Sequence, residues 1–190
     1  KPENRPQRVE DFLYHLSEVT GAGPTVVSEG ERGLEKVAEF EAHRGGVRSL
    51  ALHPSRPLLF SGARNGSVGL WSWPAGESMG MLKAHETPLA GFALSPDGHF
   101  LATAGEPGEI KLWRTEDAKM LKQLHTGLPP VSALAFAHDS QTLAAGMSDG
   151  TVYFYSPHRG EPLVVRCHPG AIETLAFSAN GQILATAGQD

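Results

Sequence analysis

Apolar and polar residues alternate along short segments of this chain, and residues that favour turns separate the segments. The stretch Val47–Leu52 reads Val-Arg-Ser-Leu-Ala-Leu, an alternation that is typical of a half-buried β-strand. Asp97-Gly98 and Asp149-Gly150 are dipeptides of the kind that close tight turns between antiparallel strands. The pattern therefore predicts an all-β protein that is built from short antiparallel strands.

The predicted strands fall into groups of four, and we expect each group to form one antiparallel sheet. The strands of the first group are Leu34–Phe40, Val47–Leu52, Leu58–Ala63 and Ser67–Trp73. The strands of the second group are Met79–Leu82, Leu89–Leu94, Phe100–Ala104 and Glu109–Trp113.

The groups repeat with a period of 42 residues, which the aromatic residues Trp71, Trp113 and Tyr155 keep. Glycines with the same spacing are Gly66, Gly108 and Gly150. A fixed period in the low forties is typical of arrays of four-stranded units. Because four short strands cannot bury both faces of their sheet alone, neighbouring copies are expected to stack and to share apolar surfaces.

This period and these strands resemble the WD40 repeat family, whose repeats form the blades of β-propellers. The resemblance covers residues 34–190 and implies an all-β, partial WD40-type propeller of about three and a half four-stranded blades. Because propellers of this family commonly close with about seven blades, we expect the chain to be a fragment, truncated at its C-terminus.

In the WD40 family, a His, a Ser or Thr, an Asp and a Trp form a hydrogen-bonded set inside each blade. The resemblance places these structural positions, in successive copies, at His43, Ser61, Asn65 and Trp71; at His85, Thr103 and Trp113; at His125, Asp149 and Tyr155; and at His168, Thr186 and Asp190.

Two copies depart from this pattern. Pro107 occupies the Asp position of the second copy, so we expect the corresponding link to be missing there. In the third copy, Ala145 replaces the hydroxyl residue and Tyr155 replaces the Trp. No Gly precedes any of the four His residues, so the period carries the resemblance more than the family's dipeptide signatures do.

The first 20 residues follow a different pattern. Apolar residues at helical spacing predict a short amphipathic helix; they are Val9, Phe12, Leu13, Leu16 and Val19. The preceding string Lys-Pro-Glu-Asn-Arg-Pro is similar to the end of the C-terminal lobe of eukaryotic-like serine/threonine protein kinases. This resemblance implies that Arg5 forms a buried ion pair with a Glu outside the chain. The alternative interpretation is an unrelated capped helix.

Three parts are therefore expected. Residues 1–20 would end a kinase C-terminal lobe, residues 21–33 would form a glycine-rich linker, and residues 34–190 would form the propeller. Bacterial kinases joined to WD repeats have this order of parts.

Composition and charge narrow the partners. Hydrophobic residues make up 40% of the chain and charged residues 19%, which suits a strand-rich globular domain. The net charge of -5 gives no basic field to attract nucleic acid or an anionic membrane surface.

Cys167 is the only cysteine, so no intrachain disulfide can form. With no signal peptide or apolar spanning segment in the sequence, we expect a cytoplasmic protein and no membrane contact from this fragment.

Catalytic chemistry is not predicted for this chain. The Gly-rich loop, the strand Lys and the two Asp residues that a kinase requires are absent, so ATP and Mg²⁺ would be cofactors of a parent kinase only. The His residues recur at one place in successive blades and are expected to be structural, because zinc requires converging ligands. We expect Cys167 to be a packed, inert thiol. No catalytic, cofactor-binding or metal-binding residue is therefore assigned.

Binding is the remaining function, because propellers of this family usually present loops to proteins or peptides. Candidate contact residues in the loops are Arg44, Arg64, Trp73, Glu86, Glu106, Arg114, His158 and Arg159. The favoured function is a protein-interaction or sensing platform attached to a serine/threonine protein kinase. One alternative is an assembly scaffold without a kinase. Another is a propeller enzyme, which the absence of converging carboxylates or histidines disfavours.

Overall fold

The computed structural model describes residues 40–43, 46–125, 129–156 and 161–189 of the 190-residue chain. Its described residues form fourteen β-strands and no helix, so the all-β prediction is confirmed. The helix expected within residues 1–20, the linker at 21–33 and almost all of the strand expected at 34–40 lie outside the described residues.

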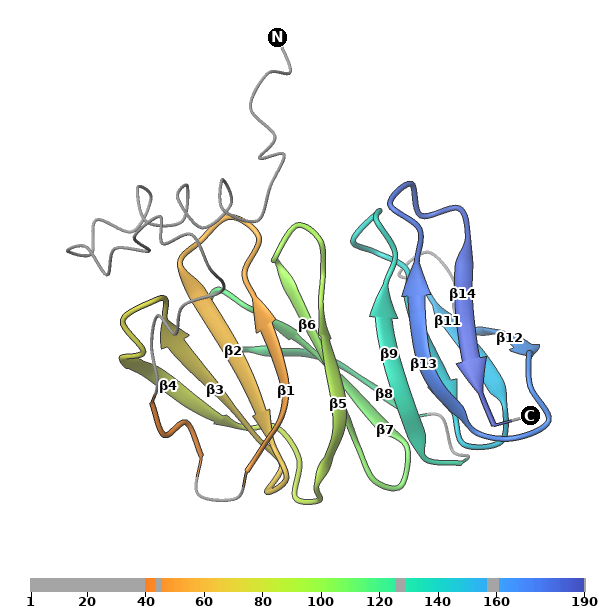
Figure 1. Cartoon of the computed structure of the whole chain (residues 1–190), viewed down its shortest axis with the longest axis horizontal. Helices are drawn as coiled ribbons and strands as arrows, with labels where there is room; N and C mark the ends of the chain where they lie inside the picture. The colour runs from red at the N-terminus through yellow and green to blue at the C-terminus, as the bar shows by residue number, and fades with distance from the viewer. Residues whose placement is uncertain (1–39, 44–45, 126–128, 157–160, 190) are drawn as a thin grey trace, which may run out of the picture.

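The strands form three four-stranded antiparallel sheets and one two-stranded sheet (Figure 1). The first sheet contains β1 (Val47–Leu52), β2 (Leu58–Ala63), β3 (Ser67–Ser72) and β4 (Ser78–Lys83). The second contains β5 (Leu89–Leu94), β6 (Phe100–Gly105), β7 (Glu109–Arg114) and β8 (Met120–His125). The third contains β9 (Val131–Phe136), β10 (Leu143–Met147), β11 (Thr151–Tyr155) and β12 (Leu163–Arg166), and the two-stranded sheet contains β13 (Ile172–Phe177) and β14 (Leu184–Gly188).

The sheets and the sequence repeats are out of phase by one strand. The expected strand Met79–Leu82 was grouped with the second copy, but Val68 pairs with Leu82 and Gly69 with Met81, so β4 is the outermost strand of the first sheet. In the same way, β8 pairs with β7 in the second sheet. Four strands per sheet were predicted correctly and their grouping was wrong. The physical reason is the short turn at residues 73–77, which returns the chain beside β3.

The sheets stand side by side and bury apolar residues between them, and strands β1, β5, β9 and β13 follow one another across the molecule (Figure 1). Between the first two sheets, Phe60 and Val68 of the first pack in one cluster with Leu89, Leu101 and Trp113 of the second. Stacking of neighbouring copies therefore supplies the core that one sheet alone could not bury.

A glycine allows the first two sheets to approach closely. A Cβ atom added to Gly62 on β2 would lie 2.7 Å from Phe92 Cδ1 and 3.1 Å from Leu89 Cδ1, both on β5. These distances are shorter than normal van der Waals contact, so no larger residue fits at this place without movement of the β5 side chains.

Candidate interaction surface and the hydrogen-bond networks beneath it

In the first and third sheets, the turn between the second and third strands is hydrogen-bonded to the connection that follows the outermost strand. Gly66 has a φ of +82°, which suits glycine, and its carbonyl accepts hydrogen bonds of 3.0 Å from the amides of both Ala84 and His85. In the third sheet the Gly150 carbonyl accepts the amides of Cys167 and His168 in the same way. In these two sheets the bond fixes the backbone of the histidine that follows the outermost strand, His85 and His168 respectively.

The first blade contains a continuous network around its repeat histidine. Trp71 Nε1 donates to Ser61 Oγ over 2.7 Å, and Ser61 Oγ lies 2.7 Å from His43 Nε2. His43 Nδ1 lies 3.2 Å from Ser67 Oγ, which donates to Asn65 Oδ1 over 2.6 Å. Asn65 is therefore linked to His43 through the hydroxyl of Ser67. Sequence analysis did not single out Ser67.

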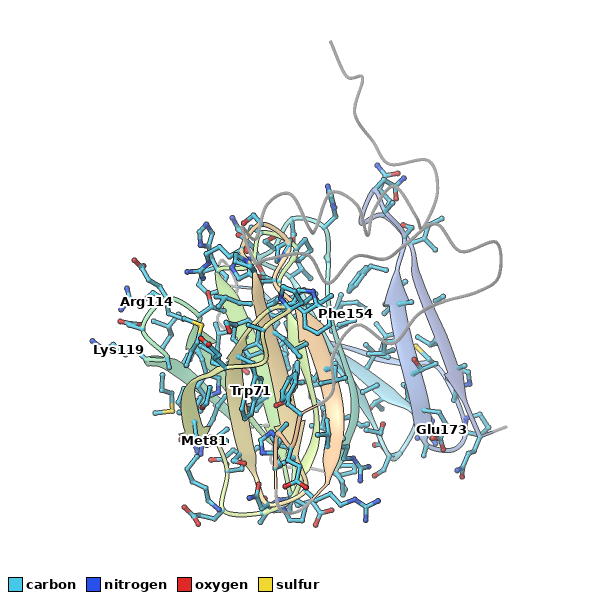
Figure 2. The ribbon with its side chains drawn as sticks, turned by 60° about the vertical axis from the view of Figure 1, so that its left-hand side comes forward. Trp71, Met81, Arg114, Lys119, Phe154 and Glu173 are labelled. Atoms are coloured by element: carbon cyan, nitrogen blue, oxygen red, sulfur yellow. The ribbon has the colours of Figure 1, made fainter. Side chains whose placement is uncertain are left out.

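Trp71 lies at the end of this network, on the face that points away from the second sheet. Its side chain is buried, and the ring of Phe40 lies 5.2 Å away between centroids. In the view of Figure 2, which brings the first sheet forward, Trp71 lies in the middle of that sheet and Met81 to its lower left.

In the second blade, Glu109 supplies the acidic link that Pro107 cannot make. Trp113 Nε1 donates to Thr103 Oγ1 over 2.9 Å, and Thr103 Oγ1 lies 2.8 Å from His85 Nε2. His85 Nδ1 lies 2.8 Å from Glu109 Oε2. The expectation of a missing link in this blade was therefore wrong, because a longer carboxylate two residues further along reaches the imidazole.

The donors and acceptors of this network are consistent with one tautomer of the neutral imidazole. The Trp113 indole can only donate and an ionised Glu109 can only accept, so His85 Nδ1 donates to Glu109 and the Thr103 hydroxyl accepts from the indole. With the imidazole neutral, Nδ1–H donates to Glu109 and Nε2 accepts from the Thr103 hydroxyl, so each of these polar groups has a partner.

Electrostatics of the two partners agree with this arrangement. Burial lowers the pKa of His85, and the nearby Lys111 cation lowers it further. The hydrogen bond to Glu109 raises this pKa but offsets the lowering only in part. Partial burial opposes ionisation of Glu109, but hydrogen bonds from His85 and Lys111 outweigh it and lower the pKa of this carboxyl. Gln123 Nε2 also donates to Glu109 Oε1 over 2.6 Å, so both carboxylate oxygens have partners.

The third blade lacks the central hydroxyl. Ala145 takes the place of Ser61 and Thr103, and the buried Tyr155 hydroxyl has no hydrogen-bond partner among the described residues. Burial raises the pKa of Tyr155 to about 12. Asp149 Oδ1 accepts from the backbone amide and the hydroxyl of Thr151, over 3.0 and 2.6 Å. The side chain of His125 lies outside the described part of the structure.

In the two-stranded sheet, His168 Nε2 lies 2.9 Å from Thr186 Oγ1, which reproduces the histidine–hydroxyl contact of the first two blades. Asp190, the acidic residue expected in this copy, lies outside the described residues, as does Arg5.

The structure places the candidate contact residues at two opposite ends of the sheets. Arg64, Glu86 and Glu106 lie in the β2–β3 turn, the β4–β5 connection and the β6–β7 turn, which share one end because the strands are antiparallel. Trp73 and Arg114 lie at the β3–β4 and β7–β8 turns, at the other end. Arg44, His158 and Arg159 lie outside the described residues. The candidates therefore do not form one surface.

The first of these ends, which we call the Arg64–Glu106 surface, is defined by the exposed residues Arg64, Lys83, Glu86 and Glu106. Lys83 Nζ lies 3.6 Å from Glu86 Oε2 and donates to the Asn65 carbonyl over 3.0 Å. Thr87 Oγ1 donates to the Glu106 carbonyl over 3.1 Å and accepts the Glu106 amide over 3.0 Å. The connection at residues 84–88 is therefore held to both blades that it joins.

At the opposite end, Arg114 forms a two-bond ion pair with Asp117, whose oxygens accept over 3.0 and 2.9 Å. Figure 2 shows Arg114 and Lys119 at the left-hand edge of the molecule. Trp73 is half-buried rather than fully exposed. This end of the sheets is also charged, but the Arg114 guanidinium is already paired with Asp117 within the β7–β8 turn.

The described residues contain no group of three or more His, Cys, Asp or Glu side chains that could hold a metal ion. Within the same residues, no helix is long and apolar enough to cross a membrane. Cys167 is exposed, so the expectation of a packed thiol was wrong; it follows the outermost strand β12, where little covers it.

Comparisons with known proteins agree with the architecture. Two solved structures, described as "Structure of U3-55K" and "Crystal structure of RRP9 WD40 repeats", share the fold with a TM-score of 0.70 and 22% sequence identity each. The similarity covers 78% of this chain but only 47% and 46% of theirs, so the chain spans about half the length of these proteins. A search among curated protein sequences gave no match.

The sequence itself matches the family described as "WD domain, G-beta repeat" over residues 34–72, 76–114, 120–156 and 160–190. These four segments make up most of the chain. Together with the 42-residue period and the stacked four-stranded sheets, they show that the chain belongs to the WD40 repeat family.

Proposed function

We propose that this chain is a protein-interaction platform that binds a protein or peptide through the Arg64–Glu106 surface. WD40 propellers generally bind proteins, and binding residues are often carried by loops on a rigid scaffold. The observation that carries the proposal is the set of exposed charged side chains at one end of two adjacent blades, on connections that hydrogen bonds hold in place.

The fixed connections favour binding in a physical sense. The Gly66 carbonyl holds residues 84 and 85, and Thr87 is bonded to Glu106 of the next blade. A partner that contacts this surface does not have to order these loops first, so less conformational entropy is lost on binding.

The charges of the surface indicate the kind of partner. Arg64 and Lys83 are cationic whereas Glu86 and Glu106 are anionic, so the surface suits a protein or peptide segment that carries charges of both signs. Because these side chains are exposed, we expect the affinity to fall as the salt concentration rises.

Affinity capture with three forms of the chain tests this proposal. One variant combines Arg64→Ala, Glu86→Ala and Glu106→Ala, and the matched control combines Arg114→Ala and Lys119→Ala at the opposite end. We expect a partner that is retained by the wild type and the control and lost by the triple variant, with the affinity then measured between the purified proteins. A partner that is lost only by the control would contradict the proposal, provided that all three forms melt alike.

We further propose that the platform is attached to a serine/threonine protein kinase in the cytoplasm. The support is the resemblance of the Lys1–Pro6 string, with the apolar residues that follow it, to the end of a kinase C-terminal lobe. In such a protein the kinase domain would bind ATP and Mg²⁺, and Arg5 would pair with a Glu of that domain.

The coding sequence upstream of Lys1 tests this attachment. We expect it to encode a kinase domain, and we expect the whole protein to transfer phosphate and Arg5→Ala to reduce that activity. An upstream region without a kinase domain would leave the assembly-scaffold alternative, and phosphate transfer that is insensitive to Arg5→Ala would show that Arg5 has another role.

A further inference from the structure

Strand β8 is the outermost strand of the second sheet, and one of its edges is open. The strand order of that sheet is β5–β6–β7–β8, so β8 pairs with β7 alone within the described part of the chain. In an antiparallel sheet, alternate residues of a strand direct their N–H and C=O groups to opposite edges. A row of backbone donors and acceptors on β8 therefore has no partner strand among the described ones.

The second sheet has a described neighbour on each side, and β8 is nevertheless exposed. The first and third sheets stand on either side of it (Figure 1). Met120 and Leu121 on β8 still have exposed fractions of 45% and 44%. Leu121 lies at a shift in the β7–β8 register and has no partner there, because Leu112 pairs with Lys122 and Trp113 with Met120. Large apolar side chains therefore remain accessible beside the open edge.

The charged side chains at this edge are cationic. Lys119 and Lys122 are both exposed, and β8 contains no Asp or Glu, although the whole chain carries a net charge of -5. Neither lysine forms an ion pair with a described residue, and Asp117 in the preceding turn is already paired with Arg114. Figure 2 shows Lys119 at the left-hand edge of the molecule. Both ammonium groups are therefore available to an anionic partner.

These charges discriminate between the strands that could pair with β8. An opposite-charge pair across two strands is favourable, and a like-charge pair is unfavourable. A second copy of β8 would bring Lys119 and Lys122 close to the same two cations, so pairing between copies is disfavoured. An extended segment with acidic residues would place carboxylates beside the lysines. Apolar residues between the acidic ones would cover Met120 and Leu121.

We propose that β8 binds an extended peptide segment of alternating acidic and apolar residues as a fifth strand of the second sheet. In strand addition of this kind, backbone hydrogen bonds supply affinity and the side chains supply specificity. The contact uses the edge of a strand and not the loops of the Arg64–Glu106 surface. It is therefore independent of the function proposed above.

Fluorescence anisotropy with labelled peptides and the whole chain tests this proposal. The probe is a short peptide of alternating Glu and Val, and the control probe alternates Lys and Val. Because the chain as a whole is acidic, long-range attraction favours the Lys–Val probe, so a preference for Glu–Val has to come from a local surface. We expect the Lys–Val probe to bind at least about tenfold more weakly. Equal binding of both probes would overturn the proposal.

Charge reversal locates the binding site. Lys119→Glu combined with Lys122→Glu should weaken binding of the Glu–Val probe by at least about tenfold. The matched control combines Arg48→Glu and Arg166→Glu, which change the net charge by the same amount at exposed positions of β1 and β12 and should leave binding nearly unchanged. An equal loss in both variants would show attraction by net charge alone and would overturn the proposal. Far-UV circular dichroism confirms that each variant is folded.

Backbone methylation distinguishes strand addition from contact through side chains alone. N-methylation of every Val blocks the N–H groups on one edge of the Glu–Val probe, and N-methylation of every Glu blocks those on the other edge. Since an added strand bonds to β8 along one edge only, one methylated probe should lose binding and the other should retain it. Equal affinity of the two methylated probes would contradict the addition of a fifth strand.

A second copy of the chain is the competing occupant of this edge. Light scattering of the wild type and of Leu121→Asp measures whether copies pair through β8. We expect the two forms to have the same mass, because the lysines oppose such pairing. A wild-type oligomer that both Leu121→Asp and the Glu–Val probe dissociate would overturn the proposal in favour of pairing between copies.

Discussion

Glu109 accepts a hydrogen bond from His85 across the second blade, with 2.8 Å between Oε2 and Nδ1. The carboxylate lies at the repeat position of Ser67 and Thr151, not at the position where the family carries its Asp. One blade of this chain therefore keeps the polar network of its family with a different residue.

Removal of the Glu109 charge should destabilise the protein. Glu109→Gln keeps the shape of the side chain but replaces charge-assisted bonds to His85 and Lys111 by neutral ones, and we expect a loss of about 1–3 kcal/mol in the free energy of unfolding. Urea denaturation measures this loss. Glu106→Gln is the matched control, because Glu106 is exposed, and it should change stability by less than about 0.5 kcal/mol. Equal effects of the two variants would contradict a role for Glu109 in the network.

Acid should weaken the fold beginning near neutral pH. Burial lowers the pKa of His85 below the ordinary value of 6.5, and burial together with Arg56 lowers that of His53. Because the unfolded chain then takes up protons more readily than the folded one, the free energy of unfolding should be highest above pH 6.5 and should fall as the pH decreases below it. The pKa of Glu109 is lowered from its ordinary value of 4.5, so protonation of this carboxyl should further reduce the free energy of unfolding below pH 4.5. Denaturation midpoints on both sides of pH 6.5 check this, and a midpoint that rises on acidification would show the wrong sign.

The buried hydroxyl groups of the blades should contribute to the free energy of unfolding only where they have hydrogen-bond partners. Ser61→Ala leaves the Trp71 indole without its acceptor and His43 Nε2 without its hydroxyl partner, so we expect a loss of about 1–3 kcal/mol in the free energy of unfolding. Tyr155→Phe removes a buried hydroxyl that has no partner among the described residues, and stability should stay within about 0.5 kcal/mol or rise. Thermal melts of the two variants compare these effects. A Tyr155→Phe loss as large as that of Ser61→Ala would show that the tyrosine hydroxyl is bonded in solution.

Two glycines in the first sheet should respond in opposite ways to an added methyl group. Gly62→Ala places a Cβ 2.7 Å from Phe92 Cδ1 at the junction of two sheets, and we expect a loss of about 1–3 kcal/mol. Gly80 lies on the exposed strand β4 with nothing within 4 Å of an added Cβ. Gly80→Ala should therefore be neutral or stabilise by up to about 1 kcal/mol, because alanine has less freedom in the unfolded chain. Calorimetric melting of both variants measures this difference in stability. An equal loss from both variants would show that the close packing of Gly62 against β5 is not what limits the side chain there.

The position of the strands could be predicted from sequence, because alternation and turn residues are local signals. Val47–Leu52 and Leu89–Leu94 were predicted with the bounds that the structure shows. The grouping into sheets could not be predicted in the same way, because the repeat period is identical whether the strand at 78–83 joins the strands before it or those after it.

The networks were only partly predictable. Residue spacing places His85, Thr103 and Trp113 in one set, but it does not show how far a side chain reaches. Glu109 is a carboxylate two residues beyond Pro107, and that was the available signal for an acidic link. The exposure of Cys167 depends on how little covers the end of β12, which no local pattern reports.

The displacement of sheets from repeats also bears on how the chain is made. Synthesis proceeds from the N-terminus, so the ribosome releases β1, β2 and β3 before β4, which pairs directly with β3. The sequence repeat therefore does not correspond to one sheet. The first strand of each repeat completes the sheet that the previous repeat began. Nascent folding of this protein should therefore lag one strand behind each repeat, and a stalled chain that ends between residues 73 and 77 would present the open edge of β3 to the cell's chaperones.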